Sequence, residues 1–318
     1  MRRCTRFSRH CVPLLILLLL FLLFAGGCSD SSGEKKEEKK PSGPPRDVTP
    51  QVLAPQAPGT VVGGTDTIRI DSSCVSDGYV VLVYTGTNEK VKLQLKMPDG
   101  VTCTYLVTAR GEPLVYPLSG GNGTYSVSVL ESVSIEEDLY AIAYTEDIPV
   151  TLSSEFAPFL TPNCYVAFTE ASACVEKGKE LADNCYSDLD VVTNIYNYVI
   201  KNISYDHEKA ENVSYGYTPD PDATLEAGNG ICFDYASLMS AMLRSQRIPS
   251  KLEVGYSGDV YHAWISCYVD EIGWVDNIIQ FDGEHWSLMD PTLAASNDSS
   301  AVKEYVGDGS NYTVKYTY

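Results

Sequence analysis

Cys232 stands where the sequence could make a thiol nucleophilic. It follows the glycine-rich turn Gly228-Asn229-Gly230, and Ile231, Tyr235 and Leu238 recur around it at helical spacing. We therefore expect Cys232 to begin a helix. At that position the unsatisfied backbone N–H groups and the positive end of the helix dipole favour the thiolate, and the same groups can stabilise an oxyanion. The chemistry predicted is attack of the sulfur on an acyl group, although a small core cysteine is the alternative interpretation.

His262 is the candidate base for this thiol. Imidazole can take a proton from a thiol and return it to a departing amine near neutral pH. His262 lies in residues 260–269, whose alternation predicts a strand with Tyr261 and Ile265 on an apolar face that enters the core. His262 and Trp264 share the opposite face, where they are expected to line a cleft. A half-buried structural histidine is the alternative.

Asp290 is the candidate third member of the site. An imidazole in this role is usually held in one tautomer by a carboxylate. Residues 286–290 predict a strand that stops before a proline, which would hold Asp290 in place. Asp276 and Asp282 are nearer to His262 in the sequence, but both lie in a predicted loop. An aspartate before proline can also be a turn former, so a structural role for Asp290 is the alternative.

Three segments, taken together, resemble the bacterial transglutaminase-like superfamily. They are G-x-C-x-D-Y-A at residues 230–236, H-A-W at 262–264 and W-x-x-x-D-P-T at 286–292. In this resemblance Cys232 corresponds to the nucleophile, His262 to the base and Asp290 to the acid that orients the base. The resemblance covers residues 187–292 and implies an α+β fold with a papain-like transglutaminase core, in which the cysteine helix packs on an antiparallel sheet.

The resemblance also implies amide chemistry through a thioester acyl-enzyme. Water as the acceptor would make the protein a cysteine peptidase or amidase, which we expect. An amine acceptor would make it a cross-linking transglutaminase, and a non-catalytic surface binding module is a third alternative. The expected partners are peptide or protein substrates, including cell-wall peptides, and no cofactor is implied. A metal site is disfavoured because the chain has no C-x-x-C pair. Trp264 and Asn229 are candidates for lining the site.

The N-terminus predicts export and lipid attachment. Four arginines precede the apolar run Val12–Phe24, which is shorter than the ~20 residues that span a bilayer. The Ala-Gly-Gly-Cys sequence that ends at Cys28 resembles the lipobox of bacterial lipoproteins, in which the cysteine receives the lipid. We therefore expect residues 1–27 to be a signal peptide. The mature protein is expected to be secreted and anchored to the outer face of the bacterial cell membrane as a lipoprotein.

Composition divides the rest of the chain into three segments. Residues 28–60 are rich in Ser, Gly, Lys, Glu and Pro, and are expected to form a disordered tether. Residues 61–152 contain short alternating runs separated by turn signals, which predicts an all-β sandwich of immunoglobulin-like kind. Its clearest strands are expected at residues 79–84, 91–95 and 124–129. Residues 153–318 change to helical spacing after Ser187 and are expected to form the transglutaminase-like domain.

Charge and cysteine content limit the partners and the redox chemistry. The formal charge of the 318 residues is −19, and it becomes −23 without residues 1–27, which hold four of the 23 Lys and Arg and no acid. The lack of a basic cluster in the mature chain argues against nucleic-acid partners. Seven of the ten cysteines remain once Cys4, Cys11 and Cys28 are set aside, so at least one is unpaired. Export permits disulfides, but the sequence leaves their pairing open.

Overall fold

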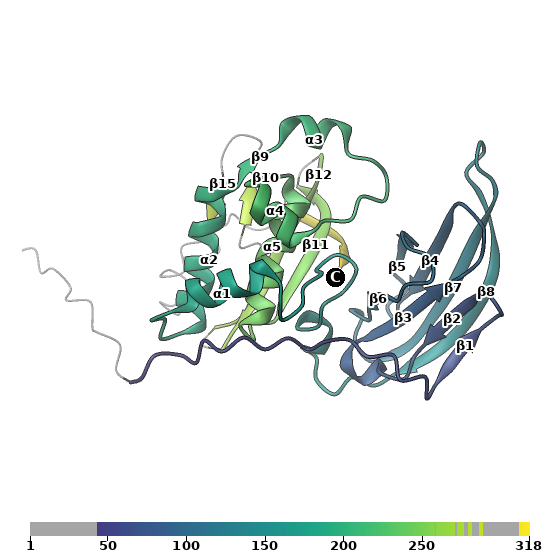
Figure 1. Ribbon diagram of the computed structural model, residues 1–318, viewed down its shortest axis with the longest axis horizontal. Helices are drawn as coiled ribbons and strands as arrows, with labels where there is room; N and C mark the ends of the chain where they lie inside the picture. Colours follow the sequence, from purple (N-terminus) through teal and green to yellow (C-terminus); the bar gives the residue numbers. More distant parts are fainter. Residues whose placement is uncertain (1–42, 258, 271, 277–278, 282–285, 289–311) are drawn as a thin grey trace, which may run out of the picture. The chain divides into compact units, whose positions relative to one another are not determined.

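The alternating and helical patterns both become regular structure in the computed structural model, which describes residues 43–257, 259–270, 272–276, 279–281, 286–288 and 312–318 (Figure 1). Cys28 and Asp290 lie outside the described residues. The described residues form a mixed α and β fold with antiparallel sheets, as the sequence predicts. We call residues 62–150 the β region and residues 173–318 the α/β region.

The β region consists of two four-stranded antiparallel sheets. The strand order is β1-β2-β3-β6 in the first sheet and β5-β4-β7-β8 in the second. The bounds are β1 (Val62–Gly64), β2 (Ile68–Asp71), β3 (Tyr79–Tyr84), β4 (Val91–Lys96), β5 (Thr102–Leu106), β6 (Leu114–Pro117), β7 (Gly123–Ser134) and β8 (Leu139–Val150). The strands predicted at residues 79–84, 91–95 and 124–129 are therefore confirmed. Side chains of both sheets, such as Leu82 and Leu93, are buried in one core. The immunoglobulin-like kind of sandwich stays a prediction.

Helices dominate the first part of the α/β region. They are α1 (Ala173–Ala182), α2 (Asp188–Asn202), α3 (His207–Asn212), α4 (Pro221–Ala227) and α5 (Cys232–Ser245). The start of α2 follows from a reciprocal cap, because Ser187 Oγ accepts the Asp190 N–H at 3.1 Å and Asp190 Oδ2 accepts the Ser187 N–H at 3.0 Å. The helix predicted after Ser187 is confirmed.

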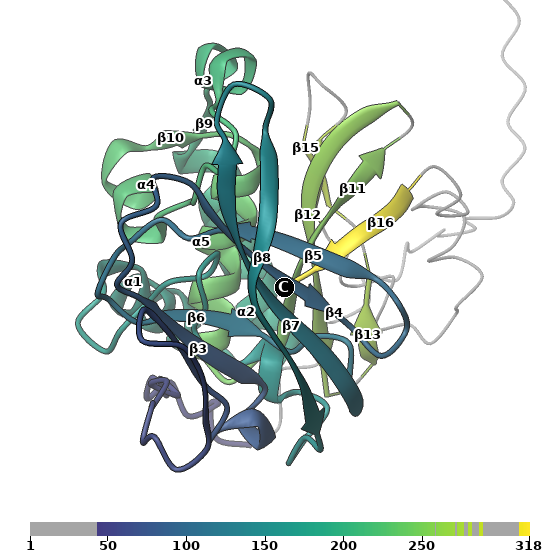
Figure 2. The same cartoon turned by 90° about the vertical axis from the view of Figure 1, so that its right-hand side faces the viewer.

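A four-stranded antiparallel sheet, with the order β13-β12-β11-β16, supports α5 (Figure 2). Its strands are β11 (Ser250–Ser257), β12 (Val260–Val269), β13 (Gly273–Val275) and β16 (Tyr312–Thr317). Ala263, Ile265 and Cys267 of β12 are buried in the same core as Leu238 and Met242 of α5. The packing of the cysteine helix on an antiparallel sheet, which the resemblance implies, is thus present in the structure.

Two short strand pairs complete the α/β region. β9 (Ser204–Tyr205) runs parallel to β10 (Asn229–Gly230), and Tyr205 lies opposite Gly230. β14 (Ile279–Phe281) pairs with β15 (Trp286–Leu288), which corresponds to the strand predicted before Asp290. The β9–β10 pair matters for function because it brings Tyr205 beside the turn that precedes Cys232.

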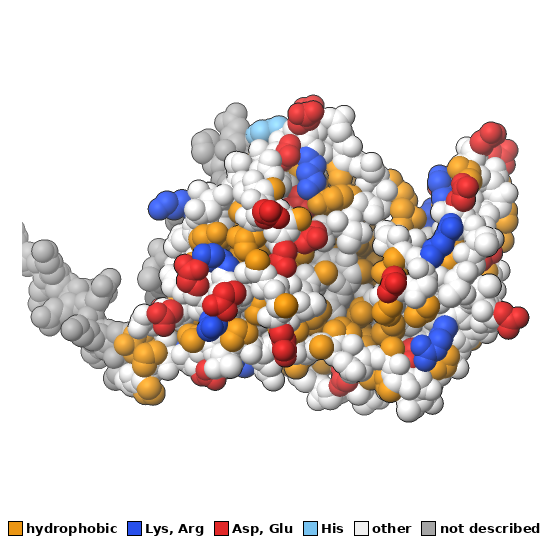
Figure 3. All heavy atoms as spheres, viewed as in Figure 1, with side chains coloured by type: hydrophobic (Ala, Val, Ile, Leu, Met, Phe, Trp, Pro, Cys, Tyr) orange, Lys and Arg blue, Asp and Glu red, His pale blue; other side chains and the backbone are white. Residues whose placement is uncertain are grey.

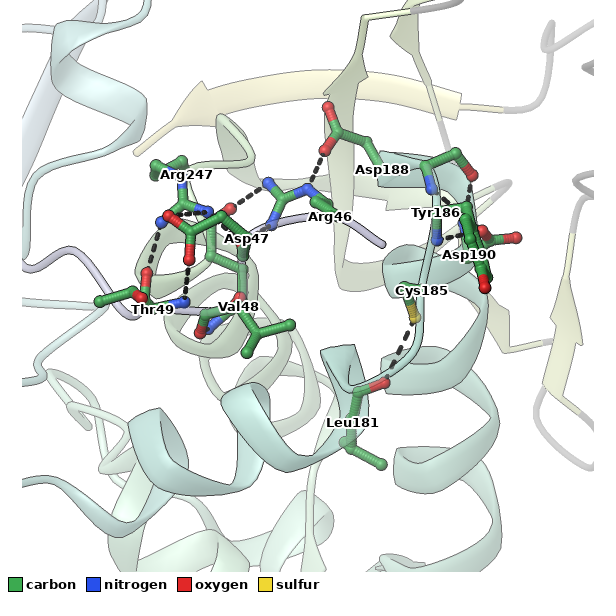
Figure 4. A network of polar contacts seen from close by, with 12 residues as sticks. Arg46, Asp47, Val48, Thr49, Leu181, Cys185, Tyr186, Asp188, Asp190 and Arg247 are labelled. Carbon is green, nitrogen blue, oxygen red and sulfur yellow. Dashed lines mark hydrogen bonds and ion pairs between the residues drawn. The ribbon is translucent and has the colours of Figure 1, made fainter. Parts of the chain in front are cut away.

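The segment before the β region packs against the α/β region. Arg46 Nε donates to Asp188 Oδ1 at 2.6 Å, and the Gln51 N–H donates to the Ser245 carbonyl oxygen at 2.8 Å. Arg247 donates to the backbone oxygens of Asp47 and Thr49 (Figure 4). The disordered tether expected over residues 28–60 is therefore wrong from Arg46 onward. The composition of this segment could not reveal its order, because these contacts come from single charged side chains and from the backbone.

The charged side chains on the face of the molecule drawn in Figure 3 are dispersed. Acidic side chains are scattered over the face drawn in Figure 3, and the Lys and Arg side chains on it lie apart from one another. Within the described ranges, no helix combines the length and apolar character that a bilayer span requires. The described cysteines, from Cys74 to Cys267, are free thiols.

Candidate active site

The local sequence sets Cys232 at the first position of α5. Gly228 ends α4 with a left-handed φ of 65°, which glycine adopts without strain. After the short strand β10, Ile231 is extended, with φ −94° and ψ 175°, and serves as the N-cap residue of α5. The predicted helix start at Cys232 is therefore confirmed.

The Cys232 thiol lies against the backbone next to His262. Burial raises the pKa of this thiol, while the backbone N–H groups of Ala263 and Phe233, which bond the sulfur, lower it. The net direction is upward, so the helix start does not lower the pKa of Cys232 below that of a free thiol. The helix N-terminus and the N–H donors act as predicted, but they do not offset the desolvation of the charged form. The thiol is consequently protonated in the resting protein near neutral pH.

His262 is buried in β12 with a free ring nitrogen. The residue is 5% exposed, and its Nε2 atom is buried without a hydrogen-bond partner among the described residues. Burial lowers the pKa of His262 to about 4, so the imidazole is neutral near pH 7. A buried polar atom without a partner costs roughly 1–3 kcal/mol, so a functional reason is needed for it. An imidazole that can accept a proton from a substrate, or from the Cys232 thiol that lines the same cavity, provides that reason.

We predict that His262 titrates far below a free histidine. A titration of the ring resonances by NMR, assigned with a His262→Gln variant, is expected to give a pKa of about 4. Between pH 6.5 and 4 the unfolded chain binds more protons at this site than the folded chain, so stability should fall as the pH is lowered through this range. A measured pKa at or above 6.5 would contradict this account of the site.

Cys232 and His262 line one cavity of about 680 Å³. Its other walls come from three places: the loop at residues 213–217, the strands β11, β12 and β16, and Thr104 and Leu106 of β5. Among the described residues that line it, none is Lys, Arg, Asp or Glu. Seven tyrosines line it, namely Tyr165, Tyr205, Tyr215, Tyr217, Tyr261, Tyr316 and Tyr318. The cavity therefore suits an uncharged ligand with apolar or aromatic groups.

Tyr205 is a site residue that the sequence analysis missed. Its hydroxyl interacts with both the backbone N–H and the thiol of Cys232, and burial raises the pKa of Tyr205 to about 12. The hydroxyl is thus a neutral donor beside the position where an acyl oxygen would lie. The family resemblance included residues 202–206, but tyrosine is so frequent in this chain, with 22 copies, that nothing in the pattern distinguishes this one from the others.

The face of β12 that was expected to line the cleft is largely closed. Trp264 is 1% exposed and stacks on His262 with ring centroids 6.3 Å apart. Its Nε1 donates to Glu253 Oε2 at 2.9 Å, and Ser266 Oγ donates to the same oxygen at 2.6 Å. Tyr261, which was expected to enter the core, is 57% exposed and lines the cavity instead. The face assignment was wrong because β12 is a central strand with burial on both faces.

Three candidates from the sequence remain, namely Trp264, Asn229 and Asp290. Trp264 supports His262 from below the surface, and Asn229 is exposed in β10; neither is among the residues that line the cavity. Asp290, the candidate orienting acid, lies outside the described residues. Its role stays a prediction.

Asp234 is held by three donors at the start of α5. Its Oδ2 accepts the Ile231 N–H at 2.8 Å and Lys209 Nζ at 2.7 Å, and its Oδ1 accepts the Tyr217 hydroxyl at 2.5 Å. Burial is the main cause of the raised pKa of Cys232, and the negative charge of Asp234 raises it further. Its main effect is structural, because it ties α3 and the 213–217 loop to the helix that carries the nucleophile.

Comparisons with known proteins agree with this geometry. Residues 176–277 match the family model of the transglutaminase-like superfamily, a range that includes Cys232 and His262. The structure describes no group of three His, Cys, Asp or Glu side chains that could hold a metal ion.

The chain also resembles individual proteins over shorter or weaker matches. It is 32% identical to a UPF0252 protein of Methanocaldococcus jannaschii over 91 residues, which are 25% of this chain and 26% of the relative. The match thus spans about a quarter of the relative's length. A candidate cysteine protease from Cytophaga hutchinsonii aligns with a TM-score of 0.34 and 16% identity, over 68% of this chain and 67% of the other. A candidate protease from Parabacteroides distasonis aligns with a TM-score of 0.28 and 15% identity, over 64% of this chain and 61% of the other.

Proposed function

From the premise that residues 176–277 form a domain of the transglutaminase-like superfamily, we propose that the protein is a cysteine peptidase or amidase that works through a thioester on Cys232. The observation that supports this most strongly is the shared cavity. A thiol at a helix start and a neutral imidazole, whose Nε2 bonds no described residue, line the same cavity, and the described lining holds no Lys, Arg, Asp or Glu. A structural cysteine and a structural histidine would have no reason to share it.

The proposed acylation begins with both groups neutral. His262 takes the proton of the Cys232 thiol as the sulfur attacks the carbonyl carbon, so the thiolate forms only when substrate is bound. The oxyanion replaces the Tyr205 oxygen as the acceptor of the Cys232 N–H, and it also accepts a hydrogen bond from the Tyr205 hydroxyl. The C–N bond then breaks, and His262 gives its proton to the departing amine. In this proposal Asp290 orients the imidazole ring.

The second half of the reaction decides the class of enzyme. Water, deprotonated by His262, attacks the thioester, the C–S bond breaks, and the proton returns to the sulfur. The products are then a carboxylic acid and an amine. The same residues would transfer the acyl group to an amine and produce a cross-link. We propose hydrolysis as the main reaction, and the masses of the products distinguish the two.

The test is a product assay with a soluble form of the mature protein, residues 29–318, which lacks the lipid-bearing Cys28. The protein is incubated with a library of unstructured peptides, with and without a primary amine, and the products are identified by mass. Cleaved or deamidated peptides are the expected result. Products that contain the added amine would make the protein a transferase, and the absence of any product would leave a binding module.

We further propose that the protein is a surface lipoprotein attached through Cys28. The support is the sequence alone, namely the apolar run followed by Ala-Gly-Gly-Cys. Cells that express the protein and are fed an alkyne fatty acid are expected to label it, and a Cys28→Ala variant should lose the label. Equal labelling of the two proteins would contradict the proposal.

A further inference from the structure

β5 is an edge strand whose free side lies at the catalytic cavity. It is the terminal strand of the sheet β5-β4-β7-β8, so within the described part of the chain only one of its sides pairs with another strand. Thr104 and Leu106 of β5 line the cavity together with Cys232 and His262. Figure 1 shows β5 on the side of the β region that faces β11 and α5. The β region, whose role the sequence left open, therefore forms part of the site.

The register of β5 shows which backbone groups its free side presents. β4 and β5 pair Leu93 with Tyr105 and Leu95 with Cys103. The hydrogen bonds Val107 N–H to Val91 and Met97 N–H to Val101 extend the same register on either side. In an antiparallel ladder, hydrogen-bonded and non-hydrogen-bonded pairs alternate. The bonded pairs are thus those of Val101, Cys103, Tyr105 and Val107.

Thr104 and Leu106 must therefore direct their N–H and C=O groups away from β4. Neither backbone makes a hydrogen bond with another element among the described residues. An open strand edge is a template for another extended chain, and proteins usually cover or blunt it. Here the open groups belong to the two β5 residues that line the cavity.

We propose that the substrate is an extended polypeptide segment that adds to β5 as a further strand and so brings its amide to Cys232. This rests on the proposed function and names its substrate class. Main-chain hydrogen bonds to Thr104 and Leu106 hold the segment whatever its sequence, as in other cases of strand addition. The tyrosines, and a described lining without Lys, Arg, Asp or Glu, select uncharged side chains near the reacting bond. A folded protein without a free extended segment is excluded as a substrate.

The binding test uses a Cys232→Ala chain, so that no peptide is turned over. The probe is a fluorescein-labelled octapeptide of alternating threonine and tyrosine, with two versions that are N-methylated at the odd or at the even residues. An added strand donates to the edge from every second residue only. One methylated version should therefore bind about tenfold more weakly or worse, as expected for losing hydrogen bonds, and the other within about twofold of the parent.

Two proline variants test the same edge from the protein side. Thr104→Pro removes an N–H from the free side of β5 and leaves the ladder to β4 intact, because proline is tolerated on the free side of an edge strand. It should weaken binding of the parent peptide about tenfold. Thr102→Pro is the matched control, since Thr102 faces the same way but does not line the cavity.

The outcomes separate this inference from the proposed function. Three results would overturn the strand addition. They are equal binding of both methylated peptides, no binding of the parent peptide, and equal effects of the two proline substitutions. Turnover of peptides by the unaltered chain together with any of those results would leave the proposed function intact. If binding depends on which residues of the peptide are methylated but no peptide is turned over, the strand addition is supported and the proposed enzymatic function is overturned.

Discussion

Replacing Cys232 with alanine is expected to lower peptide hydrolysis by about 10,000-fold or more, because Cys232 is the one thiol among the described residues that line the cavity. The substitution removes one sulfur atom from a half-buried side chain and should change the free energy of unfolding by about 1 kcal/mol or less. The measurement is kcat/KM on the best peptide from the product assay, together with a thermal melt of each protein.

The matched control for this substitution is Cys74→Ala. Cys74 is also a half-buried free thiol, but it lies in the β region and does not line the cavity. Its replacement should leave kcat/KM within about twofold of the starting protein. Comparable losses in the two variants, or residual hydrolysis by Cys232→Ala within tenfold of the starting protein, would remove Cys232 from the mechanism.

Replacing Arg244 with methionine is expected to cost about 3–5 kcal/mol of stability. Arg244 lies near the end of α5, is 1% exposed and donates to three backbone carbonyl oxygens. Nη1 bonds Thr161 at 2.8 Å, Nη2 bonds Ser250 at 2.8 Å and Tyr318 at 3.0 Å, and Nε bonds Ser250 at 3.2 Å. Methionine fills much of the space but leaves these buried oxygens without those donors. Urea unfolding, followed by tyrosine and tryptophan fluorescence, measures the loss.

Arg110→Met is the control for the buried arginine. Arg110 is exposed and donates to the backbone oxygen of Asn88. Its replacement should change stability by about 0.5 kcal/mol or less. If Arg244→Met were as stable as Arg110→Met, the buried guanidinium would not hold the end of α5 to its neighbours.

Local signals in the sequence predicted the elements that carry the reacting groups. The glycine-rich turn before Cys232 and the helical spacing after it are short-range features, and the helix begins at that residue. The same holds for α2 after Ser187 and for the strand that carries His262. Such features depend on residues within one or two turns of chain, so a single sequence is enough to find them.

The properties that depend on burial could not be obtained in this way. The pKa of Cys232 moves upward because the thiol is desolvated, and desolvation depends on groups from distant parts of the chain. Trp264 was expected in a cleft but is 1% exposed, and its indole donates to Glu253 of the neighbouring strand β11. Arg46 was assigned to a tether, yet its partner is Asp188, 142 residues away. The tyrosine-lined cavity likewise combines segments that no local pattern relates.

The most direct test of the account is to observe the acyl group on the protein. The mature chain is mixed with a reactive peptide ester, quenched in acid within milliseconds to seconds, and analysed by intact mass and peptide mapping. We predict one added acyl group, located on Cys232, that forms much more slowly in a His262→Ala variant. Products without any adduct on Cys232, or an adduct whose rate of formation does not depend on His262, would contradict the account.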